Sequence, residues 1–159
     1  MQEDDKKLIE KLHEENGFSG IISLCTKIIE HDANDVDAYF ERSSAYYFLK
    51  EWELCLQGME KMKELAPDDF RGYAGAGDAY YNLNLYEKSI ENYNKGIELN
   101  PEYWVGYNCR GNSKSKLGDK PGAIADYDKA LELNPEYWKA YLLRFIAKFK
   151  RLFMKNKSV

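Results

Sequence analysis

The sequence predicts an all-α protein, an α-solenoid built from antiparallel helical hairpins. Pro67, Pro101 and Pro135 stand 34 residues apart, and a repeat period of this length is typical of stacked helical units. The segments 95–104 and 129–138, which surround the last two prolines, are identical at eight of ten positions. Within each period, apolar and small residues recur at helical spacing in two blocks separated by a turn signal. The full hairpins are expected at 36–69, 70–103 and 104–137.

The residues before the first full hairpin carry a weaker form of the same pattern. In the frame 2–35, the segment 16–18 stands where the turn between two helices belongs. Ile21 and Cys25 stand at the packing positions of the second helix, whereas Ala33 replaces the closing proline. We therefore expect a degenerate leading hairpin over these residues.

The three full hairpins share a spacing of aromatic and small residues. In the first helix of each, an aromatic residue is followed four positions later by a small one. The pairs are Tyr39 and Ser43, Tyr73 and Gly77, and Tyr107 and Gly111. Glycine inside a helix costs about 1 kcal/mol relative to alanine, so its recurrence indicates the close approach of a second helix. The second helix of each hairpin should end before the proline, because a proline disfavours the α region for the preceding residue.

The end of the chain predicts one more helix, over 138–155, which would cap the stack. Its apolar residues recur at spacings of four, three and four, and basic residues flank this stripe. The stripe consists of Leu142, Ile146, Phe149 and Phe153. The stripe has two interpretations: it packs on the last hairpin, or it mediates self-association, for example as a homodimer. Membrane contact is disfavoured, because the acidic body of the chain would be repelled by anionic lipid.

This pattern resembles the tetratricopeptide repeat (TPR) family, whose motif is a helical hairpin with the same period. The resemblance covers 36–137 and implies a right-handed superhelix that forms a single domain over 1–159. Departures from the family pattern are Arg42, Ala76 and Arg110 in place of a leucine and Lys114 in place of a tyrosine. The resemblance also implies function: the first helices line a concave groove that binds a peptide or a segment of a partner protein.

The resemblance and the helical period together place a set of side chains on the groove wall. These are Phe40, Tyr47, Arg71, Asp78, Tyr81, Asn108, Asn112, Lys116 and Lys139. Aromatic rings at one end and cations such as Arg71 at the other predict a ligand of mixed character, with an acidic group for the cations. Asn108 and Asn112 share one helix face and would hydrogen-bond a peptide backbone, or else are simply solvated.

One well-known specificity of the family is the carboxylate clamp, which grips acidic chaperone tails with lysine, asparagine and arginine. At the matching places this chain holds Phe40, Ser44, Ala74 and Asp78, and only Asn108 and Asn112 agree with the clamp. A chaperone-clamp function is therefore disfavoured.

Composition narrows the remaining classes of function. The two histidines, His13 and His31, lie in the degenerate hairpin, and no nucleophile, phosphate loop or metal motif accompanies them. We therefore expect no catalytic residues, no cofactor and no metal site. Upstream of residue 137 the chain has 16 basic and 27 acidic residues, which disfavours nucleic-acid binding. An acidic amino terminus and three widely spaced cysteines predict a cytoplasmic protein.

Overall fold

A computed structural model describes residues 1–137, 141–146 and 148, and these residues contain helices and no strand. Eight helices are followed by a helical segment at 141–146. The helices are α1 (Glu3–Glu14), α2 (Phe18–His31), α3 (Val36–Phe48), α4 (Trp52–Leu65), α5 (Phe70–Asn82), α6 (Tyr86–Leu99), α7 (Trp104–Lys116) and α8 (Lys120–Leu133). The predicted all-α solenoid is confirmed.

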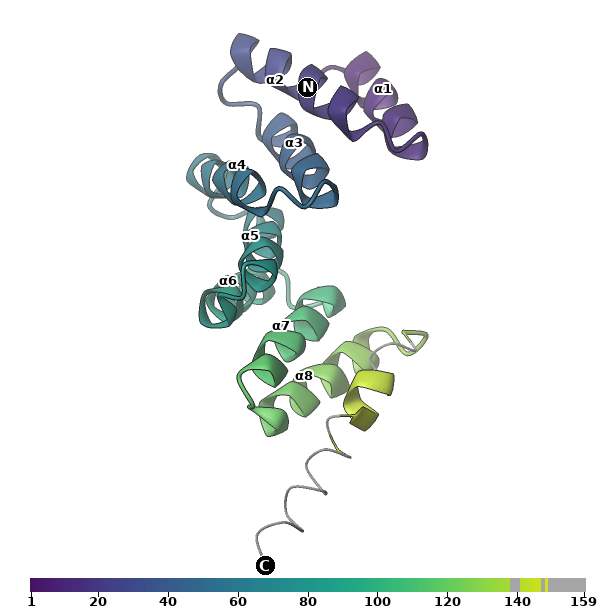
Figure 1. The fold of residues 1–159 in the computed structure, drawn as a ribbon, viewed down its shortest axis with the longest axis vertical. Coiled ribbons are helices and arrows are strands. Elements are labelled where there is room, and N and C mark those ends of the chain that lie inside the picture. The colour runs from purple at the N-terminus through teal and green to yellow at the C-terminus, as the bar shows by residue number, and fades with distance from the viewer. Residues whose placement is uncertain (138–140, 147, 149–159) are drawn as a thin grey trace, which may run out of the picture.

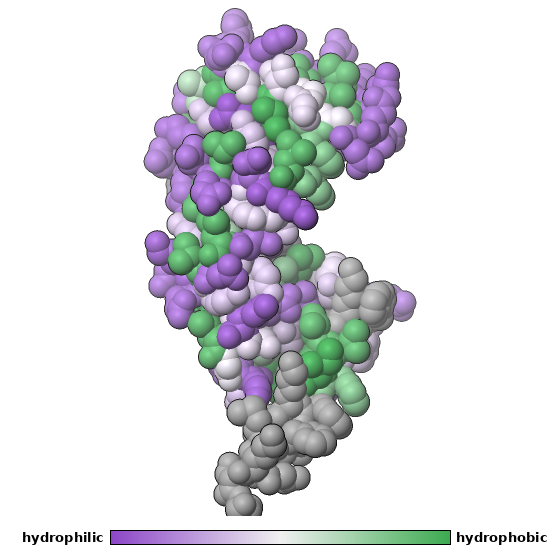
Figure 2. All heavy atoms as spheres, viewed as in Figure 1, coloured by the Kyte–Doolittle hydropathy of each residue, from purple (hydrophilic) through white to green (hydrophobic). Residues whose placement is uncertain are grey.

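Each helix packs against the next along the chain, so that the helices stack into a bent array (Figure 1). Helix α3 also contacts α5, and α5 contacts α7, which makes these first helices of successive hairpins neighbours along the inner side. Helices α4 and α6 lie on the outer side of the bend. The space-filling surface is hollowed on the inner side (Figure 2). The bend therefore gives the array a concave face built from α3, α5 and α7.

The small residues of the first helices make room for tyrosine rings from the second helices. A Cβ atom at Gly77 would lie 3.0 Å from the ring of Tyr93, and one at Gly111 would lie 2.7 Å from the ring of Tyr127. Both rings are almost fully buried, at 2% and 1% exposure. The predicted close approach is confirmed, and its physical cause is the volume of these rings.

The turns between paired helices repeat in backbone conformation as well as in sequence. Asn16, Lys50, Asn84 and Gly118 occupy equivalent positions and have positive φ angles of 54°, 63°, 61° and 85°. Asparagine and glycine tolerate this left-handed conformation, whereas most other residues pay a steric cost in it. Lys50 is therefore the strained member of the set.

Two departures from the family pattern are explained by one buried carboxylate. Asp126 on α8 is 4% exposed and accepts two hydrogen bonds from the guanidinium of Arg110, at 2.9 and 2.6 Å. The Lys114 ammonium lies 2.8 Å from the same carboxylate. The polar residues at these two positions of α7 thus face a buried anion instead of an apolar neighbour.

The two ends of the array differ in how they pack. At the start, Ile21 and Cys25 are fully buried between α2 and its neighbours, as their spacing predicted. At the other end, Leu143 packs against the core of the last hairpin, whereas Leu142 is 50% exposed and Ile146 39% exposed. The remaining stripe residues, Phe149 and Phe153, lie outside the described residues. No helix in the described part of the chain has the length and apolar character needed to cross a membrane.

Candidate binding groove

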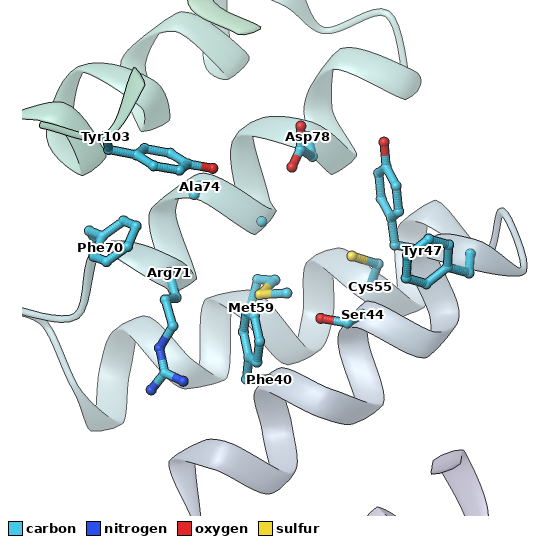
Figure 3. Close-up of a pocket in the computed structure, with 12 residues that line it drawn as sticks. Phe40, Ser44, Tyr47, Cys55, Met59, Phe70, Arg71, Ala74, Asp78 and Tyr103 are labelled. Carbon is cyan, nitrogen blue, oxygen red and sulfur yellow. The ribbon is translucent and has the colours of Figure 1, made fainter. Parts of the chain in front are cut away.

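The concave face contains a cavity of about 400 Å³, which we call the apolar cavity (Figure 3). Most of its lining side chains are aromatic, aliphatic or sulfur-containing. They are Phe40, Ser44, Tyr47, Phe48, Cys55, Met59, Phe70, Arg71, Ala74, Gly75, Asp78 and Tyr103. Helices α3, α4 and α5 supply most of them, and Tyr103 comes from the residue that precedes α7. The cavity therefore spans two hairpins and borders a third.

Small residues line the α5 side of this cavity, and large side chains enclose it. Ala74 and Gly75 carry little or no side chain, and Gly75 makes room for Met59, because a Cβ atom at Gly75 would lie 2.5 Å from the Met59 sulfur. The rings of Phe70 and Tyr103 pack together at one side, with centroids 5.0 Å apart. Figure 3 shows these two rings and Arg71 at one end of the cavity, and Asp78 and Tyr47 towards the other. A side chain at Gly75 would collide with Met59, so a larger residue there requires Met59 to move.

Arg71 is already held by two carboxylates. Its guanidinium donates to both oxygens of Asp69, with distances of 2.7 to 3.1 Å, and to Asp37 at 3.1 Å. It also lies over the ring of Phe40, 4.9 Å from the centroid. These carboxylates raise the pKa of the Arg71 guanidinium, and their two negative charges exceed its one positive charge. The expectation that Arg71 offers a free positive charge to an acidic ligand does not fit this arrangement.

Asp78 is the anion at the other end of the apolar cavity. Desolvation raises the pKa of its carboxyl group to about 6, although the hydroxyl of Tyr93, which donates to Oδ1 at 2.5 Å, acts in the opposite direction. The negative charge of Asp78 in turn adds to the raised pKa values of five neighbouring groups. These groups are Tyr47, Cys55, Tyr93, Tyr103 and Cys109. The Asp78 carboxylate thus makes ionisation less favourable for groups on several helices around it.

A second cavity of about 160 Å³ continues the groove beyond Asp78, and we call it the tyrosine cavity. Its lining consists of Tyr47, Asp78, Tyr81, Asn82, Tyr93, Cys109 and Asn112. The amide oxygen of Asn112 accepts a hydrogen bond of 3.0 Å from the hydroxyl of Tyr127. Burial raises the pKa of the Cys109 thiol to about 12, so this cysteine is not activated as a nucleophile.

The structure brings six of the predicted groove residues to these two cavities. They are Phe40, Tyr47, Arg71, Asp78, Tyr81 and Asn112. Asn108 is instead buried at 4% exposure, and Lys116 is exposed but lines neither cavity. Lys139 lies outside the described residues. That any of these residues binds a ligand stays a prediction.

The sequence analysis did not predict four large side chains of the apolar cavity. These are Phe48 at the end of α3, Met59 within α4, Phe70 at the start of α5, and Tyr103, which precedes α7. A signal was available for Phe70 and Tyr103, because each is an aromatic residue that stands shortly after the proline that ends the preceding helix.

Comparison with protein families gives two matches. The family described as "Tetratricopeptide repeat" matches residues 104–137, and the family described as "TPR repeat" matches residues 77–118. A comparison with curated proteins gave no match.

Solved structures of similar fold are numerous. A crystal structure of MamA has a TM-score of 0.83 and 21% identity, and the alignment covers 90% of this chain and 84% of MamA. The first TPR domain of human RPAP3 has a TM-score of 0.73 and 21% identity, covering 78% of this chain and 97% of that domain. The first TPR of Spaghetti (RPAP3), bound to the HSP90 peptide SRMEEVD, has a TM-score of 0.73 and 20% identity over 76% of this chain and 96% of that one. At these identities the likeness concerns the fold.

Proposed function

Because the chain belongs to the tetratricopeptide-repeat family, we propose that it is a non-enzymatic scaffold that binds a segment of another protein in its concave groove. The fold is that of a protein–protein interaction scaffold, and a structural neighbour, RPAP3, carries a bound peptide. The chemistry of the groove defines the kind of segment that it favours.

The observation that carries this proposal is the apolar cavity. A concave site that is lined mainly by aromatic and aliphatic side chains, with a few polar groups at its edges, is the usual form of a ligand site. Ser44, Ala74 and Gly75 line the cavity with small side chains, and Phe40 and Tyr103 supply ring surface from different helices (Figure 3). Such a site accepts a large apolar side chain of the partner segment as an anchor.

The charges around the cavity argue against an acidic ligand. The RPAP3 neighbour holds a peptide with acidic residues, SRMEEVD. In this chain Asp37 and Asp69 already neutralise Arg71, and Asp78 lies at the other end of the cavity. Like charges brought together in a partly desolvated groove repel each other. We therefore propose a segment with an apolar anchor and without acidic residues beside it.

Selection from a displayed random-peptide library tests the proposal. Peptides selected on the wild-type chain should contain a large apolar residue and should lose binding to Ser44→Tyr, which fills the cavity. Ser23→Tyr is the matched control, because Ser23 is an exposed serine in the middle of α2. Thermal unfolding of both variants checks that they are folded. Peptides that bind Ser44→Tyr as well as the wild type would contradict binding in this cavity.

A second candidate function is self-association through the segment at 141–146. The observation that favours it is the exposure of neighbouring apolar side chains, with Tyr141 and Leu142 at 50% and Ile146 at 39%. Apolar spheres gather beside the grey atoms at this end of the molecule (Figure 2). Exposed apolar patches of this kind mark interaction surfaces in soluble domains.

Sedimentation velocity over a wide concentration range tests self-association. A dimer that dissociates when Leu142→Glu or Ile146→Glu is introduced would support this second function. A monomer at every concentration would exclude it and leave the groove as the interaction site.

We also place this scaffold in the cytoplasm as part of the proposal. Cys25, Cys55 and Cys109 are all free thiols, and the first two are fully buried on separate hairpins. Free cysteines without partners are common in reducing compartments.

A further inference from the structure

We propose that the tyrosine cavity is a cation subsite that binds the positively charged side chain of a lysine or arginine in the partner segment. This inference rests on the proposed function and deepens it, because it names a second chemical group of the ligand. The ligand would carry a basic residue close to its apolar anchor.

Asp78 has no counter-charge among the residues that the structure describes. Its carboxylate accepts a hydrogen bond from the neutral hydroxyl of Tyr93, and no ion pair involves it in the described part of the chain. Arg71, which borders the same apolar cavity, is occupied by Asp69 and Asp37. A desolvated carboxylate without a cation is unfavourable, and a ligand cation would remove that cost.

The negative charge of Asp78 lies among neutral side chains in the wall of the tyrosine cavity. Tyr47 on α3, Tyr93 on α6 and Cys109 on α7 line the tyrosine cavity together with Asp78, and Asp78 carries the one formal charge among the lining residues. Burial is the main cause of the raised pKa values of these three groups, and the negative charge of Asp78 adds to it. A cavity with one carboxylate and no cationic side chain in its lining attracts a cation and repels an anion.

The walls of the tyrosine cavity are rich in tyrosine rings. Tyrosine faces attract ammonium and guanidinium groups, and this attraction strengthens when water is excluded. The ring of Tyr47 packs against Trp52 with centroids 5.1 Å apart, and the ring of Tyr81 packs against Tyr86 at 5.5 Å. These contacts hold both rings in place before a ligand arrives. The subsite is therefore preorganised, which limits the entropy lost on binding.

The arrangement also fixes where the basic group would lie relative to the anchor. Tyr47 and Asp78 line both cavities, so that the two subsites share a boundary. A cavity of about 160 Å³ has room for the end of one side chain. We therefore expect the anchor and the basic residue to be close neighbours in the bound segment.

Small probes test the subsite by NMR. The cationic probes are n-butylammonium and n-propylguanidinium, and 1-butanol is the neutral isostere of the first. The side-chain amides of Asn82 and Asn112 report on the tyrosine cavity, because both line it. We expect at least one cation to shift these signals saturably and to bind about tenfold more tightly than 1-butanol, the size of a cation–aromatic and ion-pair contribution at a half-open site.

Variants make the test specific. Asp78→Asn keeps the shape of the side chain and an oxygen for the Tyr93 hydroxyl, and it should abolish the preference for the cation. Glu87→Gln, which removes an exposed carboxylate from α6, should leave the preference unchanged. Equal binding of 1-butanol and the cations, no saturable shift at millimolar concentrations, or an unchanged preference in Asp78→Asn would each overturn the cation subsite.

A third probe separates this inference from the proposed function. N-acetylphenylalaninamide should bind in the apolar cavity and shift the backbone amide of Gly75. Binding of this probe without binding of either cation would overturn the cation subsite and leave the proposed groove function standing. Absence of both would count against the two proposals together.

Discussion

Replacing Asp78 by asparagine should stabilise the fold at neutral pH. The folded state raises the pKa of this carboxyl group from 3.8 to about 6, a shift of about two units. Each unit corresponds to about 1.4 kcal/mol, so the ionised carboxylate costs at most about 3 kcal/mol in the folded state. Because the groove opens to water, we expect Asp78→Asn to raise the free energy of unfolding by about 1 to 2 kcal/mol at pH 7.5.

The pH dependence of this gain gives the sharper test. The folded state binds the Asp78 proton more tightly than the unfolded state, so protonation stabilises the fold below about pH 4, and this stabilisation is lost as the pH rises through about 6. The advantage of Asp78→Asn should therefore be present at pH 7.5 and absent at pH 4.

Urea unfolding followed by far-UV circular dichroism at both pH values measures this difference, and Glu87→Gln controls for the loss of one negative charge. An equal gain at both pH values, or no gain at pH 7.5, would refute the view that Asp78 is a desolvated anion without a counter-charge.

Three further substitutions, one of which is a control, test the packing of the array. Lys50→Gly should raise the free energy of unfolding by about 0.5 to 1 kcal/mol, because glycine relieves the cost of a positive φ of 63°. Lys61→Gly, within α4, should instead lower it by about 1 kcal/mol, and a loss in both variants would contradict the strain at Lys50. Asp126→Ala should lower the free energy of unfolding by about 3 to 5 kcal/mol, because it leaves Arg110 and Lys114 without their shared anion. Urea unfolding measures all three changes, and a loss below about 1 kcal/mol for Asp126→Ala would show that the network contributes little.

The periodic features of this chain were predictable because each depends on local sequence. A proline disfavours the α region for the residue before it, so Pro67 and Pro101, which follow helical patterns, mark hairpin boundaries without knowledge of the fold. The small residue at Gly77 indicates close packing in the same way, and the ring of Tyr93 provides it. The helix face of Asp78 followed from the family resemblance together with the helical period.

The chemistry of the groove was less predictable, because it depends on pairs of side chains from different hairpins. Arg71 contacts Asp37 of the preceding hairpin, and no spacing rule within one helix indicates this pairing. The desolvation of Asp78 depends on how closely other hairpins surround it, including Tyr103 at the start of α7. The sequence predicted a ligand of mixed character with an acidic group for the cations, whereas the structure places the Asp78 carboxyl group between the two cavities of the groove.

Amide hydrogen exchange on the chain with and without a library-selected peptide tests the central claim most directly. If the partner segment binds in the groove, the peptide should slow exchange in α3 and α5 and around Tyr103, and the segment at 141–146 should exchange as before. Protection confined to 141–146, with no change in α3 and α5, would contradict the groove as the binding site and would favour the apolar segment at the end of the array instead.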